Sequence, residues 1–245
     1  TNSTNSHLRK MIFSNGSYLL SDPLIPPGTP TNPTRYSNLA YRAQDGYLYA
    51  TAPAAKKLVR IGANGARADM PWPVSVNGVI APPNVNASNQ TVNYAGAAFS
   101  NSGYFYISGS DAKFYKIDVT TNPPTAVDFI NTVGLPATGP QDFVISTDEK
   151  WIYGIYGRAA NDPTPGAQLI RVSLDDSTGY PKGTIHYISA PLARPSTFPP
   201  TQTGTLGAVY GDLTGNLYGA RNYDGHLFRI DISGMDTPNP TASYT

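Results

Sequence analysis

Short runs of alternating apolar and polar residues, bounded by Gly, Ser, Asn and Asp, recur along the chain. Tyr104–Ile107 and Phe114–Ile117 are two such runs, and both are rich in aromatic and β-branched side chains. This pattern favours β-strands, because such side chains suit a pleated, half-buried surface. Prolines interrupt much of the remaining sequence, and each would break the interior of a helix. We find no convincing amphipathic helix, so the pattern predicts an all-β fold.

The strand pattern occurs four times. In each unit a short strand of small apolar residues precedes a tight turn, a second strand carries a tyrosine, and a third strand reads apolar-x-basic-apolar. The repeated tyrosines are Tyr49, Tyr106, Tyr153 and Tyr218, and the repeated basic residues are Arg60, Lys116, Arg171 and Arg229. Units of this kind, about 47 to 65 residues apart, predict four-stranded antiparallel blades around an axis, which is a β-propeller.

The two ends of the chain bear on the expected number of blades. Leu8–Met11 and Tyr18–Leu20 resemble the third and fourth strands of a blade, and Ala242–Tyr244 resembles an outer strand. We therefore expect one propeller domain over residues 1–245 with five blades, or six if the segment 178–200 contains another. Either the termini pair irregularly to close the ring, or the chain is a fragment of a longer protein.

Composition narrows the class of protein. Only 13% of residues are charged, Gly and Pro number 23 each, and the chain has no Cys. A net charge of +1 creates no field that would attract nucleic acid or anionic lipid. No run approaches the ~20 apolar residues of a membrane helix, and the lack of Cys excludes disulfides and thiolate catalysis. We expect a β-rich protein with many loops, no nucleic-acid partner and no membrane insertion.

Several segments carry a family resemblance. They are Ser37–Tyr41 before Gly46–Ala50, Leu58–Gly62 with Asn64–Gly65, Gln141–Phe143, and Gly215–Tyr218 with Gly225–Asp231. In this order they resemble an extracellular β-propeller family of unknown function, found in bacterial surface proteins and secreted fungal proteins. The resemblance covers most of the chain and implies a secreted or surface propeller. It implies no catalytic residue, and the Pro-rich insertions 71–94 and 191–204 depart from it.

Repeated and non-repeated residues receive different interpretations. A residue that recurs at one position of every unit usually packs between blades. We therefore expect the repeated tyrosines in the core, and the repeated basic residues bonded to carbonyls or carboxylates between blades. Residues that do not recur and lie on loops are better candidates for binding.

One face of a propeller collects the loops from each outer strand to the next inner strand and from each second strand to the third. We call it the loop face. Its aromatic rings, amides and charges suit stacking on a sugar ring and bonding to its hydroxyls, although an ordinary polar surface is the alternative. The ligand-binding candidates are Arg35, Tyr36, Lys57, Tyr94, Asp111, Lys113, Gln141, Asp142, Arg158, Arg221, Asn222, Tyr223 and Asp224.

Asp142 stands out among these candidates because it begins an inner strand. Its carboxylate is expected near the mouth of the central channel, where it could bind a Ca²⁺ ion or organise water. Capping of a turn, or a bond to a neighbouring backbone group, is the alternative interpretation. We expect no other cofactor.

The supply of carboxylates bears on catalysis. Glycosidases need two suitably spaced carboxyl groups, yet Asp142 is the only clear acid on an inner strand and Glu149 is the only glutamate. We therefore predict binding of glycan or cell-wall polysaccharide without catalysis, and no catalytic residue. An extracellular carbohydrate-active enzyme, either hydrolase or lyase, stays open because loop acids such as Asp162 lie on the same face. A purely structural surface protein also stays open.

Four sequons make Asn2, Asn15, Asn86 and Asn89 candidate glycosylation sites, at the terminus, in a turn and in a loop rich in Pro and Asn. No signal peptide is visible, and the chain could begin after one was removed. We expect a secreted or surface location. The oligomeric state, the sugar specificity and the source organism stay open.

Overall fold

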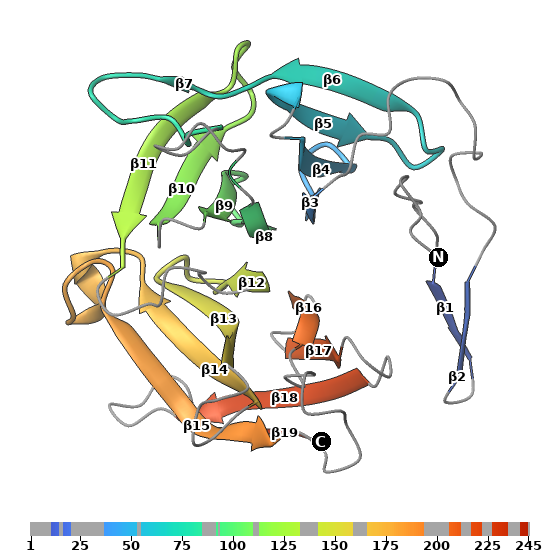
Figure 1. Cartoon of the computed structure of the whole chain (residues 1–245), viewed down its shortest axis with the longest axis vertical. Coiled ribbons are helices and arrows are strands. Elements are labelled where there is room, and N and C mark those ends of the chain that lie inside the picture. The colour runs from blue at the N-terminus through green and yellow to red at the C-terminus, as the bar shows by residue number, and fades with distance from the viewer. Residues whose placement is uncertain are drawn as a thin grey trace.

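The computed structural model of the chain describes residues 11–14, 17–20, 37–52, 55–84, 92, 94–109, 113–132, 142–158, 166–193, 206–211, 217–221, 227–234 and 241–244. Apart from a two-stranded hairpin, these residues form four sheets of consecutive antiparallel strands, which we call blades I to IV in chain order (Figure 1). In Figure 1 the inner strands of the four blades surround the centre of the molecule.

The strands of each blade run in sequence order from the axis outward. Blade I contains β3 (Ser37–Arg42), β4 (Tyr47–Ala52), β5 (Lys57–Ile61) and β6 (Arg67–Pro71). Blade II contains β8 (Tyr94–Phe99), β9 (Phe105–Gly109), β10 (Lys113–Asp118) and β11 (Thr125–Asn131), and β7 (Val74–Ser75) adds a parallel strand beside β11. Blade III contains β12 (Asp142–Ile145), β13 (Trp151–Arg158), β14 (Gly166–Ser173) and β15 (Ile185–Ala193), with a 3₁₀ turn, η2 (Asp176–Thr178), before β15. Blade IV contains β16 (Leu206–Gly211), β17 (Leu217–Arg221), β18 (Leu227–Gly234) and β19 (Thr241–Tyr244).

The prediction of a propeller with antiparallel blades is confirmed, but the described residues form four blades, not five or six. Of the two strands expected near the N-terminus, Tyr18–Leu20 lies within β2 (Ser17–Leu20), whereas the expected strand Leu8–Met11 lies outside the described residues except for Met11. β2 pairs with β1 (Met11–Ser14), and among the described residues these two strands form a separate hairpin and no full blade. In the segment 178–200, the described residues 178–193 contain the end of a turn and β15, the outer strand of blade III, and no strand of a further blade. The expected outer strand near the C-terminus is β19 of blade IV.

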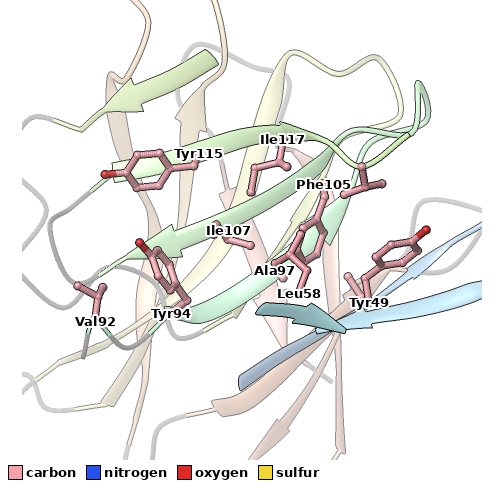
Figure 2. Close-up of a cluster of buried hydrophobic side chains, with 11 residues drawn as sticks. Tyr49, Leu58, Val92, Tyr94, Ala97, Phe105, Ile107, Tyr115 and Ile117 are labelled. Atoms are coloured by element: carbon pink, nitrogen blue, oxygen red, sulfur yellow. The ribbon is translucent and has the colours of Figure 1, made fainter. Parts of the chain in front are cut away.

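The core lies between neighbouring blades, and three of the four repeated tyrosines belong to it. Tyr49, Tyr106 and Tyr153 are buried. Figure 2 shows Tyr49 and Leu58 of blade I packed toward Phe105 and Ile107 of blade II. Such burial between sheets is where most of the favourable free energy of folding arises. The expected core role of these three tyrosines is confirmed. The fourth, Tyr218, is half-buried and stacks on Tyr210 with ring centroids 5.1 Å apart.

Each repeated basic residue lies directly opposite the repeated tyrosine of the neighbouring strand. The cross-strand pairs are Tyr49 with Arg60, Tyr106 with Lys116, Tyr153 with Arg171, and Tyr218 with Arg229. In the first three blades the cation also covers an aromatic ring near the start of the second strand, on Tyr47 (4.5 Å), Tyr104 (4.2 Å) and Trp151 (4.1 Å).

This arrangement adds an aromatic partner that the sequence did not predict for the basic residues. The three cations lie over ring faces in cation–π contacts, and the expected bonds to carbonyls or carboxylates between blades stay a prediction. Arg171 further donates from Nε to Nδ1 of His186 on the adjacent outer strand, over 2.8 Å.

A chain of hydrogen bonds crosses from blade to blade through the turns between first and second strands. Gln44 of blade I donates to the carbonyl of Asn101 over 2.6 Å, and Asn101 of blade II donates to the carbonyl of Thr147 over 2.8 Å. Ser102 donates from both its backbone nitrogen and its hydroxyl to the carboxylate of Glu149 in blade III, the hydroxyl bond being 2.7 Å long. These bonds tie the turns of blades I to III together on the face opposite the loop face.

Glu149 has an unusual backbone conformation, with φ of 57°, where the corresponding turns of blades I and II place Gly46 and Gly103. Alanine at this site keeps the left-handed backbone cost but removes the bonds to Ser102. We expect Glu149→Ala to lower the free energy of unfolding by about 1 kcal/mol, measured by urea denaturation. Glu149→Gln preserves an acceptor and a donor for Ser102 and should cost less than half as much. Equal losses in the two variants would show that the contact with Ser102 contributes nothing.

Candidate functional site

Several predicted binding residues lie at strand ends on the loop face. Lys57 and Lys113 begin the third strands of blades I and II, and Tyr94 and Asp142 begin inner strands. The backbone of Arg158 and of Arg221 ends the second strands of blades III and IV, but their side chains lie outside the described part of the structure. Outside the described residues altogether are Arg35, Tyr36, Asp111, Gln141, Asn222, Tyr223 and Asp224, together with the sequon residues Asn2, Asn15, Asn86 and Asn89.

The two lysines have different surroundings. Lys57 Nζ lies 2.7 Å from Oδ2 of Asp69, and Arg67 Nε lies 2.6 Å from Oδ1 of the same carboxylate. Lys57 thus forms a solvent-exposed ion pair, and the carboxylate of Asp69 is shared between Lys57 and Arg67. The ammonium of Lys113 lies 6.0 Å from the ring centre of Phe129, at the outer limit of a cation–π contact.

Tyr94 does not offer its ring to the loop face, contrary to the expectation from sequence. Its side chain is 1% exposed, packs against Trp72 and Tyr115, and donates its hydroxyl to the carbonyl of Pro83. Trp72 similarly donates from Nε1 to the carbonyl of Pro82 over 2.7 Å. The two aromatic side chains therefore fasten the Pro-rich insertion to blade II, and Tyr94 is a core residue.

Asp142 lies where the inner strands of three blades meet. Its Oδ1 accepts a hydrogen bond from its neighbour Phe143 N over 2.9 Å, and its Oδ2 accepts one from Val209 N of β16, also over 2.9 Å. The backbone N–H of Ala97 on β8 is a third donor. Because β8, β12 and β16 are the innermost strands of their sheets, their axial edges carry unpaired backbone groups. The carboxylate satisfies such groups on both neighbouring blades.

The environment of Asp142 changes its acidity. Burial raises the pKa of this carboxyl to about 7, although the N–H groups of Val209, Phe143 and Ala97 act in the opposite direction by stabilising the charged form. The residue is only half-buried, so part of it is accessible to solvent. A carboxyl group that titrates near neutral pH can accept hydrogen bonds from hydroxyls or exchange a proton with a bound molecule.

Asn38 is the counterpart of Asp142 in blade I, and the sequence reading missed it. Its Oδ1 accepts from the backbone nitrogen and hydroxyl of Thr51 over 3.1 and 2.8 Å, and its Nδ2 donates to the carbonyl of Tyr94 in blade II over 3.2 Å. Spacing could have revealed it, since Asn38 precedes Tyr49 by the same eleven residues that separate Asp142 from Tyr153. The same spacing leads to Ala95 and Gly207 in blades II and IV. By strand register, Gly96 and Ala208 take the place of Asp142 there, and none of these residues has a side chain that can form a hydrogen bond.

Within the described ranges, no three His, Asp or Glu side chains gather as they would around a metal ion. A Ca²⁺ ion near Asp142 stays a prediction. The same part of the chain contains no helix of the length and apolar character that a membrane span requires.

The arrangement of the four sheets defines the class of this protein as a β-propeller with antiparallel blades. The sequence matches the family described as a repeat of unknown function (DUF6923) over residues 4–244, so the chain belongs to that family. No curated protein matches it.

Solved structures share the fold at low sequence identity. A protein from Lactobacillus plantarum is 13% identical, with a TM-score of 0.52 over 100% of this chain and 65% of that one. A chain of a nidogen/laminin complex is 10% identical, with a TM-score of 0.51 over 92% of this chain and 70% of its own. Virginiamycin B lyase from Staphylococcus aureus is 13% identical, with a TM-score of 0.47 over 94% and 59% of the two chains. This chain thus spans less than two thirds of several matched structures, and the likeness concerns fold alone.

The raised pKa of Asp142 predicts a pH-dependent contribution to stability. Its pKa is 3.8 in an unfolded chain and about 7 in the folded protein. The folded state binds the proton more tightly, so stability due to this group is present at low pH and is lost as pH rises toward 7. Between pH of about 5 and about 8 we expect the wild type to lose roughly 2 to 3 kcal/mol of unfolding free energy relative to Asp142→Asn, which cannot ionise.

Urea denaturation of both proteins at the two pH values measures this difference. Other groups with shifted pKa values, such as His186, Asp45 and Asp69, are common to both proteins and cancel in the comparison. Parallel pH profiles for the two proteins would mean that Asp142 does not titrate between these values in the folded state.

Proposed function

We propose that this chain is a non-catalytic binding propeller, secreted or held at the cell surface, that takes a glycan or cell-wall polysaccharide at its loop face. The low content of charge and the Pro- and Gly-rich loops are compatible with an extracellular setting. The likeness to a chain of the nidogen/laminin complex supports only the fold, and the laminin partnership belongs to that complex.

The observation that carries this proposal is the position of Asp142. It is a half-buried carboxylate at the loop-face end of an inner strand, held in place by backbone N–H groups from its own and neighbouring blades. Such fixed acceptors favour ligands rich in hydroxyl donors, because the site pays little entropy to orient them. Lys57 and Lys113 lie at strand ends on the same face and extend its polar surface.

Binding without catalysis is favoured by the way the other acids are used. Asp45 bonds to Arg42 and Tyr49, Asp128 to Lys182, and Glu149 to Ser102. In these contacts the carboxylates join strands, turns or blades instead of facing Asp142. These three carboxyl groups are therefore engaged in structural contacts, and none of them is offered as the second carboxyl group that a glycosidase mechanism needs.

A carbohydrate-active enzyme is the second candidate, and one observation favours it. The pKa of Asp142, about 7, is suited to a general acid or base at neutral pH. Release of reducing ends or unsaturated sugars from a polysaccharide would support this candidate against simple binding. A purely structural surface protein would bind no glycan and release no product.

Asp142→Asn is expected to weaken glycan binding at least about tenfold, equivalent to about 1.4 kcal/mol, because the amide replaces one carboxylate oxygen with a donor. Binding is measured on a glycan array and by sedimentation with cell-wall polysaccharide, near pH 8 so that the wild-type carboxylate is ionised. The matched control is Asp148→Asn, since Asp148 is exposed in a turn on the opposite face and accepts from Ser146 Oγ over 2.6 Å.

Near-ultraviolet circular dichroism confirms that both variants remain folded. Equal effects of the two substitutions would remove the loop face as the binding surface. Absence of wild-type binding to every glycan would overturn the proposed function itself.

A further inference from the structure

Two Asn-Gly pairs lie in described turns of the chain. Asn64 and Gly65 connect β5 to β6, whereas Asn77 and Gly78 lie in the insertion between β6 and β8. In such a pair the backbone nitrogen of glycine can attack the side-chain amide of asparagine, because glycine has no side chain to hinder the approach. Whether it does so depends on how firmly the turn holds both groups.

The turn at Asn64 holds them firmly. Asn64 Oδ1 accepts from Ala66 N over 2.9 Å, and the nitrogen of Gly65, which is the atom that would attack, donates to the carbonyl of Gly62 over 2.9 Å. Gly65 is buried, and the paired strands β5 and β6 continue directly from the turn. Attack would therefore require several hydrogen bonds to open together.

The turn at Asn77 is much less constrained. Both Asn77 and Gly78 are exposed, and an isolated bridge between Val76 and Val79, with one hydrogen bond of 2.9 Å, closes the turn. Ala81 N also donates to Ser75 Oγ across this loop over 2.9 Å, and this bond involves neither Asn77 nor Gly78. Among the described residues, neither the Asn77 side chain nor the Gly78 nitrogen has a hydrogen-bond partner. A Cβ atom placed on Gly78 would meet no atom within 4 Å, so the space around the attacking nitrogen is open.

We propose that Asn77 is a site of spontaneous deamidation and isoaspartate formation in the folded protein. Asn64 is protected from the same reaction by the hydrogen bonds of its own turn. The Gly78 nitrogen forms a bond to Cγ of Asn77, the side-chain nitrogen leaves as ammonia, and the proton of the Gly78 N–H goes to that leaving group. The product is a cyclic imide. Water then adds to one of the two imide carbonyls and opens the ring to aspartate or isoaspartate.

The change alters a defined surface. Asn77 follows β7, which pairs with β11 of blade II. Two apolar residues near it are exposed, Val74 by 40% and Ile80 by 63%. Deamidation places a negative charge on this apolar edge, and isoaspartate lengthens the backbone inside the turn. This inference is independent of the proposed glycan binding.

The test incubates the folded protein at mildly alkaline pH and follows both sites by peptide mapping with fragmentation that localises the modified residue. We expect the conversion at Asn77 to be at least about tenfold faster than at Asn64, because the weaker turn opens more often. The urea-unfolded chain is the matched control, in which both Asn-Gly pairs are equally free and should react at similar rates. An isoaspartyl methyltransferase assay on the isolated peptides identifies the isoaspartate product.

The proposal is overturned if folded Asn64 reacts as fast as Asn77, or if Asn77 stays intact while the unfolded control reacts. Val79→Pro removes the backbone donor that closes the turn at Asn77, and it should accelerate conversion there but leave Asn64 unchanged. An unchanged rate at Asn77 in this variant would show that the turn bond does not control the reaction.

Discussion

The blades of this propeller depend on satisfying the backbone where their inner strands meet. β3, β8, β12 and β16 are edge strands of their own sheets, and an edge strand leaves backbone N–H and C=O groups without ladder partners. Buried groups of this kind are costly unless a hydrogen bond compensates them. Asn38 and Asp142 provide such bonds from one blade to the next. Asp142 thus joins neighbouring blades and also places its carboxyl group at the loop face.

Close approach of the inner strands explains their composition. A Cβ atom on Gly96 of blade II would lie 2.8 Å from the ring of Phe143 in blade III, which leaves no room for a side chain. Further from the axis the blades diverge, and aromatic side chains fill the space between them. There the tyrosine of the second strand and the basic residue of the third strand lie opposite each other in the sheet.

The sequence was sufficient to predict the repeated strands, the core position of three tyrosines and the propeller architecture, because these follow from periodic patterns. The number of blades could not be predicted, since β1 and β2 match outer strands by pattern without showing whether inner strands accompany them. Tyr94 begins an inner strand, as a loop-face residue would, but its ring turns into the core when the Pro-rich insertion folds over it. The cations were assigned polar partners because sequence does not reveal that Tyr47, Tyr104 and Trp151 present their ring faces.

Side chains that form hydrogen bonds at the axial position come from alternate blades along the chain. Blades I and III contribute Asn38 and Asp142, while the corresponding Ala95 and Gly207 of blades II and IV have no side chain that can form a hydrogen bond. Blades I and III therefore supply the polar side chains at the axis. Blades II and IV supply the backbone groups that bond to these side chains. Insertion of a single blade between two of them, or removal of blade II or III, would place two blades of the same kind side by side, whereas insertion of a pair would preserve the alternation along blades I to IV. For this family member, the unit that can be duplicated without rebuilding the axis is the blade pair.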